Sequence, residues 1–165
     1  MAGIDELDEE GRRRLAAALF NHVWTLLERP GRTADEDEEM VHAAHASAHH
    51  WSTVGTIANR ARSEWQCSRV YAVLGRAEPA LHHARRCLEL CESAPEEVEE
   101  FDLPFAYEAM ARAYAVAGEE AASREWLGRA RAAAERIVDE DDRLLLEADL
   151  ATIPQRYRAS VREWM

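Results

Sequence analysis

The stretch Trp65–Glu92, WQCSRVYAVLGRAEPALHHARRCLELCE, predicts two short helices joined at Gly75. Apolar and small side chains recur on both sides of the glycine at the three- and four-residue steps that share one helical face. They are Cys67, Val70, Tyr71 and Leu74 in the first helix, and Ala80, Leu81, Ala84, Cys87, Leu88 and Cys91 in the second. Gly75 suits the left-handed backbone conformation that ends a helix, and Pro79 is tolerated in the first turn of the next one. Because so short a pair cannot bury its apolar faces alone, we expect it to stack on neighbouring helices.

The composition of the whole chain also favours helices. The chain has 165 residues, of which 47% are apolar, with only 7 glycines and 5 prolines. This length suits one domain with its own core, and the runs rich in alanine, arginine and glutamate lose little side-chain freedom in a helix. No segment alternates apolar and polar residues over the length of a strand. We therefore predict a single all-α domain over residues 1–165, with antiparallel helical hairpins stacked as an array or closed into a compact bundle.

The charge and the cysteines limit the kinds of partner and compartment. A net charge of −12 argues against a nucleic-acid partner, because phosphates require a basic face. No apolar run approaches the roughly 20 residues that cross a bilayer, and the acidic first residues lack the apolar core of a secretory signal. Cys67, Cys87 and Cys91 all lie on predicted apolar faces, where buried reduced thiols are the expectation. These features predict a cytoplasmic protein with neither a nucleic-acid nor a membrane partner.

The residues that typically begin and end helices predict about seven helices along the chain. They cover residues 8–28, the segment from the acidic run after Thr33 to residue 54, and residues 56–74, 78–92, 104–118, 119–138 and 139–153. Pro154 ends the last of these, and the tail QRYRASVREWM is expected to add a short amphipathic cap. The acidic segment 93–103 is the longest expected connection between helices.

The hairpin around Gly75 has a second, looser copy. Tyr71 precedes Gly75 by four residues, and Tyr114 precedes Gly118 by four. The small residues that follow the two glycines at the same distance are Ala80 and Ser123. This pattern resembles the tetratricopeptide repeat, a helix–turn–helix unit whose small residues let two helices pack closely. The two glycines lie 43 residues apart, whereas the repeat has a period of about 34, so the resemblance implies an insertion or longer helices.

The resemblance covers about residues 61–137 and implies a division of the chain into hairpins. Residues 59–93 form the first repeat-like hairpin and residues 94–138 the second. Residues 1–58 form an N-terminal helical pair that could be a degenerate repeat, and residues 139–165 form a capping helix and tail.

What the resemblance implies for function is a concave face lined by the first helix of each pair. In this chain that face would present Arg62, Trp65, Gln66, Arg69 and Val73, followed by Phe105, Glu108 and Arg112. Its arginines and aromatic side chains could bind an acidic or carboxylate-ended peptide through charge-assisted hydrogen bonds and apolar contact. The lysine and asparagine clamp of some family members is absent, so no particular partner is implied. The alternative is a compact bundle in which these arginines pair with the many carboxylates of the chain.

Histidines form the most specific chemical pattern of the sequence. Glu38, His42, His45 and His49 follow steps of four, three and four residues, which place them in one column of a helix. With His22 from the preceding helix, whose position predicts an inward-facing side chain, they could hold Zn, Fe, Ni or Cu. The alternative is a solvated polar stripe and a His22 bonded to a backbone carbonyl. His82 and His83 are predicted to lie on the surface.

Three functions therefore stay open at the level of the sequence. The first is a protein- or peptide-interaction module, and the second is a metal-binding protein or metalloenzyme that uses the histidine site. The third is a helical bundle that binds a small molecule in an interior pocket lined by histidine and tryptophan. The standard metalloenzyme, phosphate-loop and nucleophile motifs are absent, so the catalytic residues, the partner and the oligomeric state are not determined by the sequence.

Overall fold

The computed structural model describes residues 6–154, and its regular structure there is helical, with no strand. The helices are α1 (Glu9–Leu27), α2 (Ala34–Val54), α3 (Ile57–Val73), α4 (Ala77–Ser93), the short 3₁₀ helix η2 (Pro95–Glu97), α5 (Asp102–Val116), α6 (Glu120–Ala134) and α7 (Glu140–Ala151). The predicted all-α fold is confirmed. Helix α6 ends at Ala134 rather than near residue 138, because the chain turns there and carries Ile137 into the core. The expected amphipathic cap in the tail lies outside the described residues.

Several helices begin after an N-cap residue whose side-chain oxygen accepts a hydrogen bond from the backbone of the first turn. Thr33 and Glu36 form a reciprocal capping box at the start of α2, and Thr56 and Asn59 form one at the start of α3. Asp139 accepts a hydrogen bond from the backbone N–H of Asp142 in the first turn of α7. These bonds satisfy backbone donors that have no partner within the helix, so the helix starts are encoded locally.

Both glycines of the two sequence copies end a helix in the same way. Gly75 and Gly118 have φ angles of 72° and 77°, in the left-handed region that favours glycine. The residue after each glycine donates its backbone N–H to the carbonyl of the tyrosine that lies four residues before the glycine. Arg76 donates to Tyr71, and Glu119 donates to Tyr114. This is the Schellman arrangement, in which the reversal of the chain satisfies the last carbonyls of the helix.

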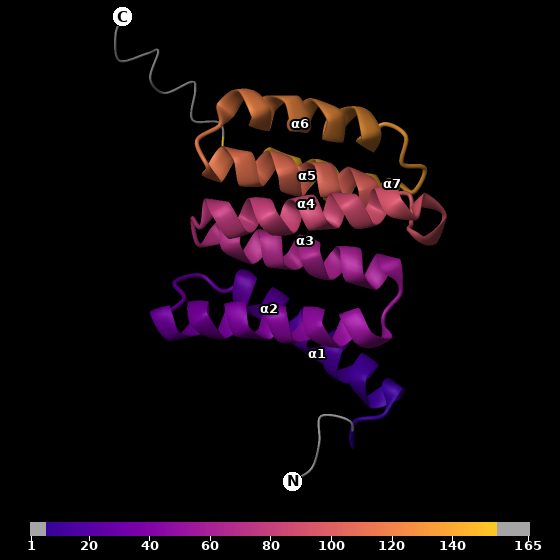
Figure 1. Ribbon diagram of the computed structural model, residues 1–165. Helices are drawn as coiled ribbons and strands as arrows, with labels where there is room; N and C mark the ends of the chain where they lie inside the picture. The colour runs from indigo at the N-terminus through magenta and orange to yellow at the C-terminus, as the bar shows by residue number, and fades with distance from the viewer. Residues whose placement is uncertain (1–5, 155–165) are drawn as a thin grey trace, which may run out of the picture.

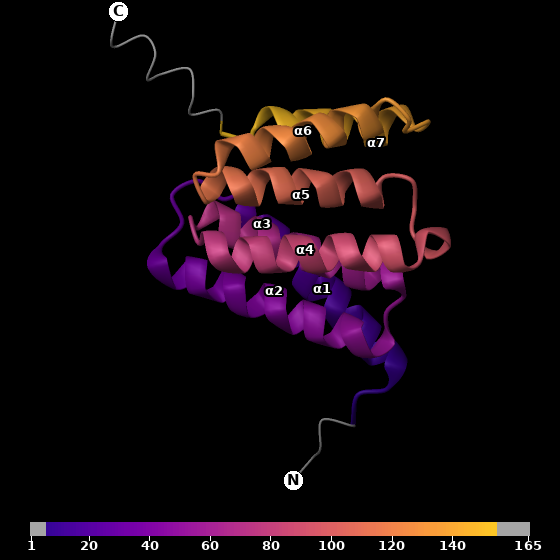
Figure 2. The ribbon, with the colours of Figure 1, turned by 45° about the horizontal axis from the view of Figure 1, so that its top comes forward.

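The helices pack as hairpins stacked one on another. Figures 1 and 2 show α1 beside α2, α3 beside α4 and α5 beside α6, with α7 covering the last hairpin. The core has three clusters of buried apolar residues along the stack. Helix α3 contributes to the cluster with α1 and α2 and also to the central cluster with α4 and α5. Helix α5 contributes to the central cluster and also to the cluster with α6 and α7. Each hairpin therefore depends on its neighbours for burial, which is the packing logic of a helical repeat.

A buried serine links the two helices of every hairpin. The hydroxyl of Ser47 donates to the carbonyl of Ala16 at 2.8 Å, that of Ser68 to Ala80 at 2.9 Å, and that of Ser123 to Ala111 at 2.8 Å. Ser68 and Ala111 hold the same position before their hairpin glycine, and Ala80 and Ser123 the same position after it. The last two hairpins thus share one contact in which donor and acceptor have exchanged helices.

Removal of either hydroxyl is expected to lower stability by a similar amount. Ser68→Ala and Ser123→Ala should each reduce the free energy of unfolding by about 1 kcal/mol, because each deletes one buried hydrogen bond. The two losses should add in the double variant, since the bonds lie in different hairpins. Urea denaturation measures both, with Ser52→Ala as the control because its hydroxyl bonds only to the nearby His49 carbonyl at an exposed site. Equal effects of all three substitutions would contradict the structural role of the buried pairs.

Candidate functional site

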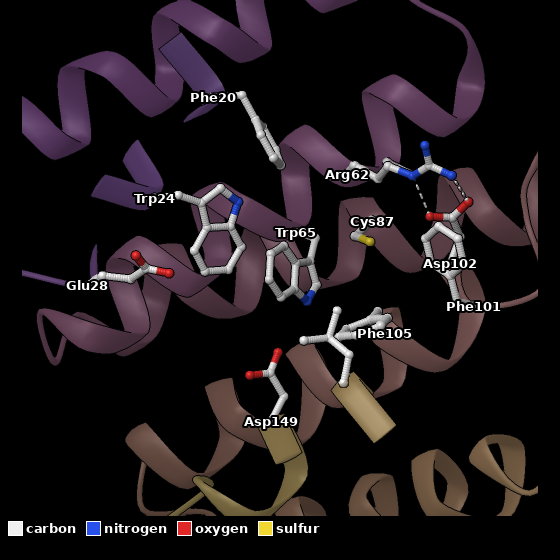
Figure 3. A pocket seen from close by; sticks show the side chains of 12 residues that line it. Phe20, Trp24, Glu28, Arg62, Trp65, Cys87, Phe101, Asp102, Phe105 and Asp149 are labelled. Carbon is white, nitrogen blue, oxygen red and sulfur yellow. Dashed lines mark hydrogen bonds and ion pairs between the residues drawn. The ribbon is translucent and has the colours of Figure 1, made fainter. Parts of the chain in front are cut away.

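A pocket of about 570 Å³ opens on the face that α1, α3, α5 and α7 share. These are the first helix of each hairpin and the covering helix, and Cys87 of α4 lies at the base of the pocket. Five aromatic side chains line it, namely Phe20, Trp24, Trp65, Phe101 and Phe105. The polar residues of the wall are Glu28, Arg62, Asp102 and Asp149 (Figure 3). Ala61 and Leu145 complete the apolar lining.

The aromatic rings of the pocket contact one another in a chain. The ring centroids of Trp24 and Trp65 are 5.6 Å apart with their planes at 35°, and those of Trp65 and Phe105 are 5.7 Å apart at 85°. Such tilted and edge-to-face contacts are the favoured geometries of aromatic pairs. The rings come from α1, α3 and α5, so the stacking of three hairpins builds the apolar wall.

A buried network of ionic groups supports the Trp65 side of the pocket. Glu108, which is fully buried, accepts hydrogen bonds from Trp65 Nε1 at 2.9 Å and from Arg112 Nε at 2.6 Å. Arg69 Nη2 lies 3.5 Å from Glu108 Oε1 and 2.7 Å from Asp149 Oδ2. The Arg69 guanidinium also lies 5.3 Å from the ring centroid of Trp65. The network holds the orientation of Trp65 and joins α3, α5 and α7.

Two arginines form further hydrogen bonds that connect the helices around the pocket. Arg112 Nη2 donates to the backbone carbonyl of Asp149 at 2.9 Å and to Thr152 Oγ1 at 2.8 Å, which fastens the end of α7 to α5. Arg62 bonds both oxygens of Asp102 at 2.8 Å, and its guanidinium lies over the ring of Phe101. The hydrogen bond to Asp102 raises the pKa of Arg62, so the guanidinium stays charged.

The groove predicted from the sequence is partly assembled here. Arg62, Trp65 and Phe105 line the pocket, while Arg69, Glu108 and Arg112 lie in the network beside it. Gln66 is buried and instead donates to the carbonyl of Phe20 at 3.0 Å. All three arginines are paired with carboxylates of the chain, as the alternative interpretation anticipated.

Sequence reasoning missed the contribution of α1 and α7 to the pocket. Phe20 and Trp24 of α1 and its C-cap residue Glu28 recur at four-residue steps, so their common face was detectable in the sequence. Leu145 and Asp149 of α7 show the same step. What the sequence does not indicate is that these two faces lie across from each other.

The structure does not bring the five predicted metal ligands together. Glu38 pairs with Arg76 of the α3–α4 turn at 3.0 Å, and His45 Nε2 lies 2.8 Å from the Tyr71 hydroxyl. His49 contacts the ring of His50, and His42 is exposed. Within residues 6–154, no group of three histidine, cysteine or acidic side chains is placed to hold a metal ion.

The predicted inward orientation of His22 is wrong. Its imidazole is 43% exposed and lies 2.6 Å from Glu39 of α2. Val23 and Leu26 are the buried residues of this part of α1, so His22 lies outside the buried face of the helix. This exposed contact with Glu39 gives the His22 imidazole a polar partner outside the core.

A different histidine cluster joins α2, α3 and α4. His83 was predicted to be a surface residue, but its side chain is only 14% exposed, and its Nδ1 lies 2.6 Å from Glu64 Oε2. The His83 ring stacks on Tyr71 and contacts the ring of His45. Partial desolvation is the main cause that lowers the pKa of His45, and the neighbouring His83 adds to it.

This environment predicts a pH-dependent contribution of His45 to stability. Because the pKa of His45 is lower in the folded than in the unfolded protein, the unfolded chain takes up a proton more readily, and stability falls as the pH drops below about 6.5. The free energy of unfolding should therefore decrease less between pH 7.5 and 5.5 in His45→Gln than in the original protein. Urea denaturation at the two pH values measures this, with His82→Gln as a control that removes an exposed imidazole from α4. An equal decrease in all three proteins would contradict it.

The cysteines are buried and free, as predicted. Burial raises the pKa of Cys67 to about 12, and a hydrogen bond with Cys91 together with burial raises that of Cys87 well above its ordinary value. Since the thiolate is the nucleophilic form, Cys87 is an apolar part of the pocket base at neutral pH.

The fold and the site define a stacked helical-hairpin protein with an aromatic pocket on the face of its odd-numbered helices. The chain matches no protein-family model, no curated protein and no solved structure. Among residues 6–154, no helix combines the length and the apolar character that a bilayer crossing requires.

Proposed function

We propose that this chain is a tetratricopeptide-like interaction module that binds a segment of a partner protein in the aromatic pocket. The observation that carries the proposal is the position of the pocket on the face lined by α1, α3, α5 and α7. A site built across several hairpins can contact an extended peptide along its length. The matching turns at Gly75 and Gly118 and the related serine contacts support the repeat character of the hairpins.

The chemistry of the pocket favours an apolar anchor on the partner. Aromatic side chains are the typical hot spots of protein interfaces, because they bury a large area at a small cost in side-chain entropy. Trp65 and its neighbours are held in place by the network around Glu108, so little ordering is required when a partner binds. The arginines no longer favour the acidic peptide that the sequence suggested, because each is paired within the chain.

The volume also fits the third function considered from the sequence, a small-molecule site. About 570 Å³ lies in the range of ligand pockets. The lining differs from the expectation, however, since the described residues that form it include tryptophan but no histidine. We favour a peptide over a small molecule as the ligand, because the pocket opens on a face that extends across several hairpins.

Selection of peptides from a random displayed library tests the proposal. Peptides enriched on the intact protein should bind Leu145→Arg at least about tenfold more weakly, because Leu145 lines the pocket and is 60% exposed, so a larger side chain obstructs the opening without disturbing the core. Leu144→Arg is the matched control, since Leu144 is 51% exposed but does not line the pocket. If no peptide is enriched, or if the two variants bind alike, the proposed function is wrong.

A further inference from the structure

We propose that the pocket recognises a basic residue of the partner segment, an arginine or lysine side chain flanked by apolar residues. This inference rests on the proposed function and specifies the chemistry of its partner. It reverses the polarity expected from the sequence, in which arginines of this chain would have bound carboxylates. The reversal follows from the charges that the pocket leaves uncompensated and from its aromatic faces.

The ionic groups around the pocket leave one carboxylate without a cation. Arg62 neutralises Asp102, and Arg69 and Arg112 neutralise Glu108 and Asp149. The remaining charged residue of the lining is Glu28, whose carboxylate has no hydrogen-bond or ion-pair partner among residues 6–154. A partner that brings one positive charge to Glu28 would therefore complete the charge balance of the site.

The aromatic rings next to this carboxylate suit an organic cation. Glu28 lies beside Trp24 in Figure 3, and Trp24 contacts Trp65. Cations bind favourably over the faces of tryptophan and phenylalanine, and more so where water is excluded. Two such contacts already lie in and beside the pocket, with Arg69 near the Trp65 ring at 5.3 Å and Arg62 near the Phe101 ring at 4.9 Å. Trp24 has no such cation over its ring among the described residues.

The overall charge is consistent with a basic partner. A chain with a net charge of −12 attracts basic segments over long distances and repels acidic ones. The apolar remainder of the pocket, with Phe20, Phe105 and Leu145, would accept the residues on either side of the basic one.

Three short peptides that differ only in the central residue test the inference. They are the acetylated amides Leu-Arg-Leu, Leu-citrulline-Leu and Leu-Glu-Leu, titrated into the full-length ¹⁵N-labelled protein. The readout is the pair of indole N–H signals of Trp24 and Trp65, assigned with the Trp24→Phe and Trp65→Phe variants. The arginine peptide should bind about tenfold more tightly than the citrulline peptide, and the glutamate peptide more weakly still.

Glu28→Gln should remove most of the preference for arginine over citrulline, because it deletes the unpaired charge at an exposed position. Glu147→Gln is the matched control, as Glu147 is exposed on α7 and does not line the pocket. It should retain the preference. Loss of the preference in both variants would indicate long-range attraction to the acidic chain rather than a specific site, and would overturn the inference.

The other outcomes separate this inference from the proposed function. Equal or stronger binding of the citrulline or glutamate peptide overturns the preference for a cation and leaves the peptide-binding function standing. Failure of all three peptides to shift the signals overturns the inference, whereas the displayed library decides the function. If free arginine amide binds as tightly as the peptide, the site takes a small organic cation and not a protein segment.

The chain itself contains basic residues beyond the described part, at Arg156, Arg158 and Arg162. A full-length variant with all three changed to serine should show the Trp24 and Trp65 indole signals at their original positions before any peptide is added. A shift of both signals would identify the C-terminal segment of the chain as the occupant and overturn the assignment to a partner.

Discussion

Glu108→Gln is expected to lower the free energy of unfolding by about 3–5 kcal/mol, because it leaves two arginines near the pocket without their shared counter-charge. Glu108 is fully buried, and the side chains of Arg112 and Arg69 are 9% and 12% exposed. The amide of glutamine would also present a donor to side chains that can only donate. Chemical denaturation measures the loss, and a substitution of the same shape limits the effect to charge and hydrogen bonding.

The effect should extend to α7, since the same network holds its end. Arg112 bonds both Glu108 and the end of α7, so amide hydrogen exchange in Glu140–Ala151 should become faster in Glu108→Gln. Glu125→Gln is the control, because Glu125 forms an exposed pair with Arg129 that contributes little. A loss of stability no larger than that of the control would show that the buried network is not important for stability.

Leu146→Ala should destabilise the protein by about 2–5 kcal/mol, and Leu145→Ala should change stability by less than about 1 kcal/mol. The two leucines are consecutive in α7, but Leu146 is fully buried against the core of α5 and α6, whereas Leu145 is 60% exposed. Truncation of Leu146 removes apolar burial and leaves a cavity, while truncation of Leu145 affects mainly the opening of the pocket.

Thermal and urea denaturation of both variants provide the measurement. Leu145→Ala should retain the melting temperature but weaken the binding of any peptide selected on the pocket. Similar destabilisation by both substitutions would mean that α7 packs with a different face, and it would remove the basis for placing Leu145 and Asp149 in the pocket wall.

Local features of the sequence predicted the helices and their ends well. These features are apolar residues at helical steps, capping side chains such as Thr33 and Thr56, and the glycines at positions 75 and 118. Each of them determines the conformation of the chain only within a few residues of its own position. The all-α fold, the hairpin around Gly75 and the buried cysteines follow from such short-range rules, and the structure confirms them.

The composition of the pocket and the pairing of its charges depended on tertiary structure. Phe20 and Asp149 lie far apart in the chain and line one pocket only because the hairpins stack in a particular order. Arg69 and Arg112 looked available for a partner, yet α3, α5 and α7 bring carboxylates to both. His22 was expected to be buried and His83 to be exposed, but His22 is exposed and His83 is mostly buried. The neighbours of a helix set its rotation about its own axis, and this rotation decides which of its side chains are buried. A residue pattern specifies the faces of each helix, but the contacts between distant helices decide which faces meet and which charges remain unpaired.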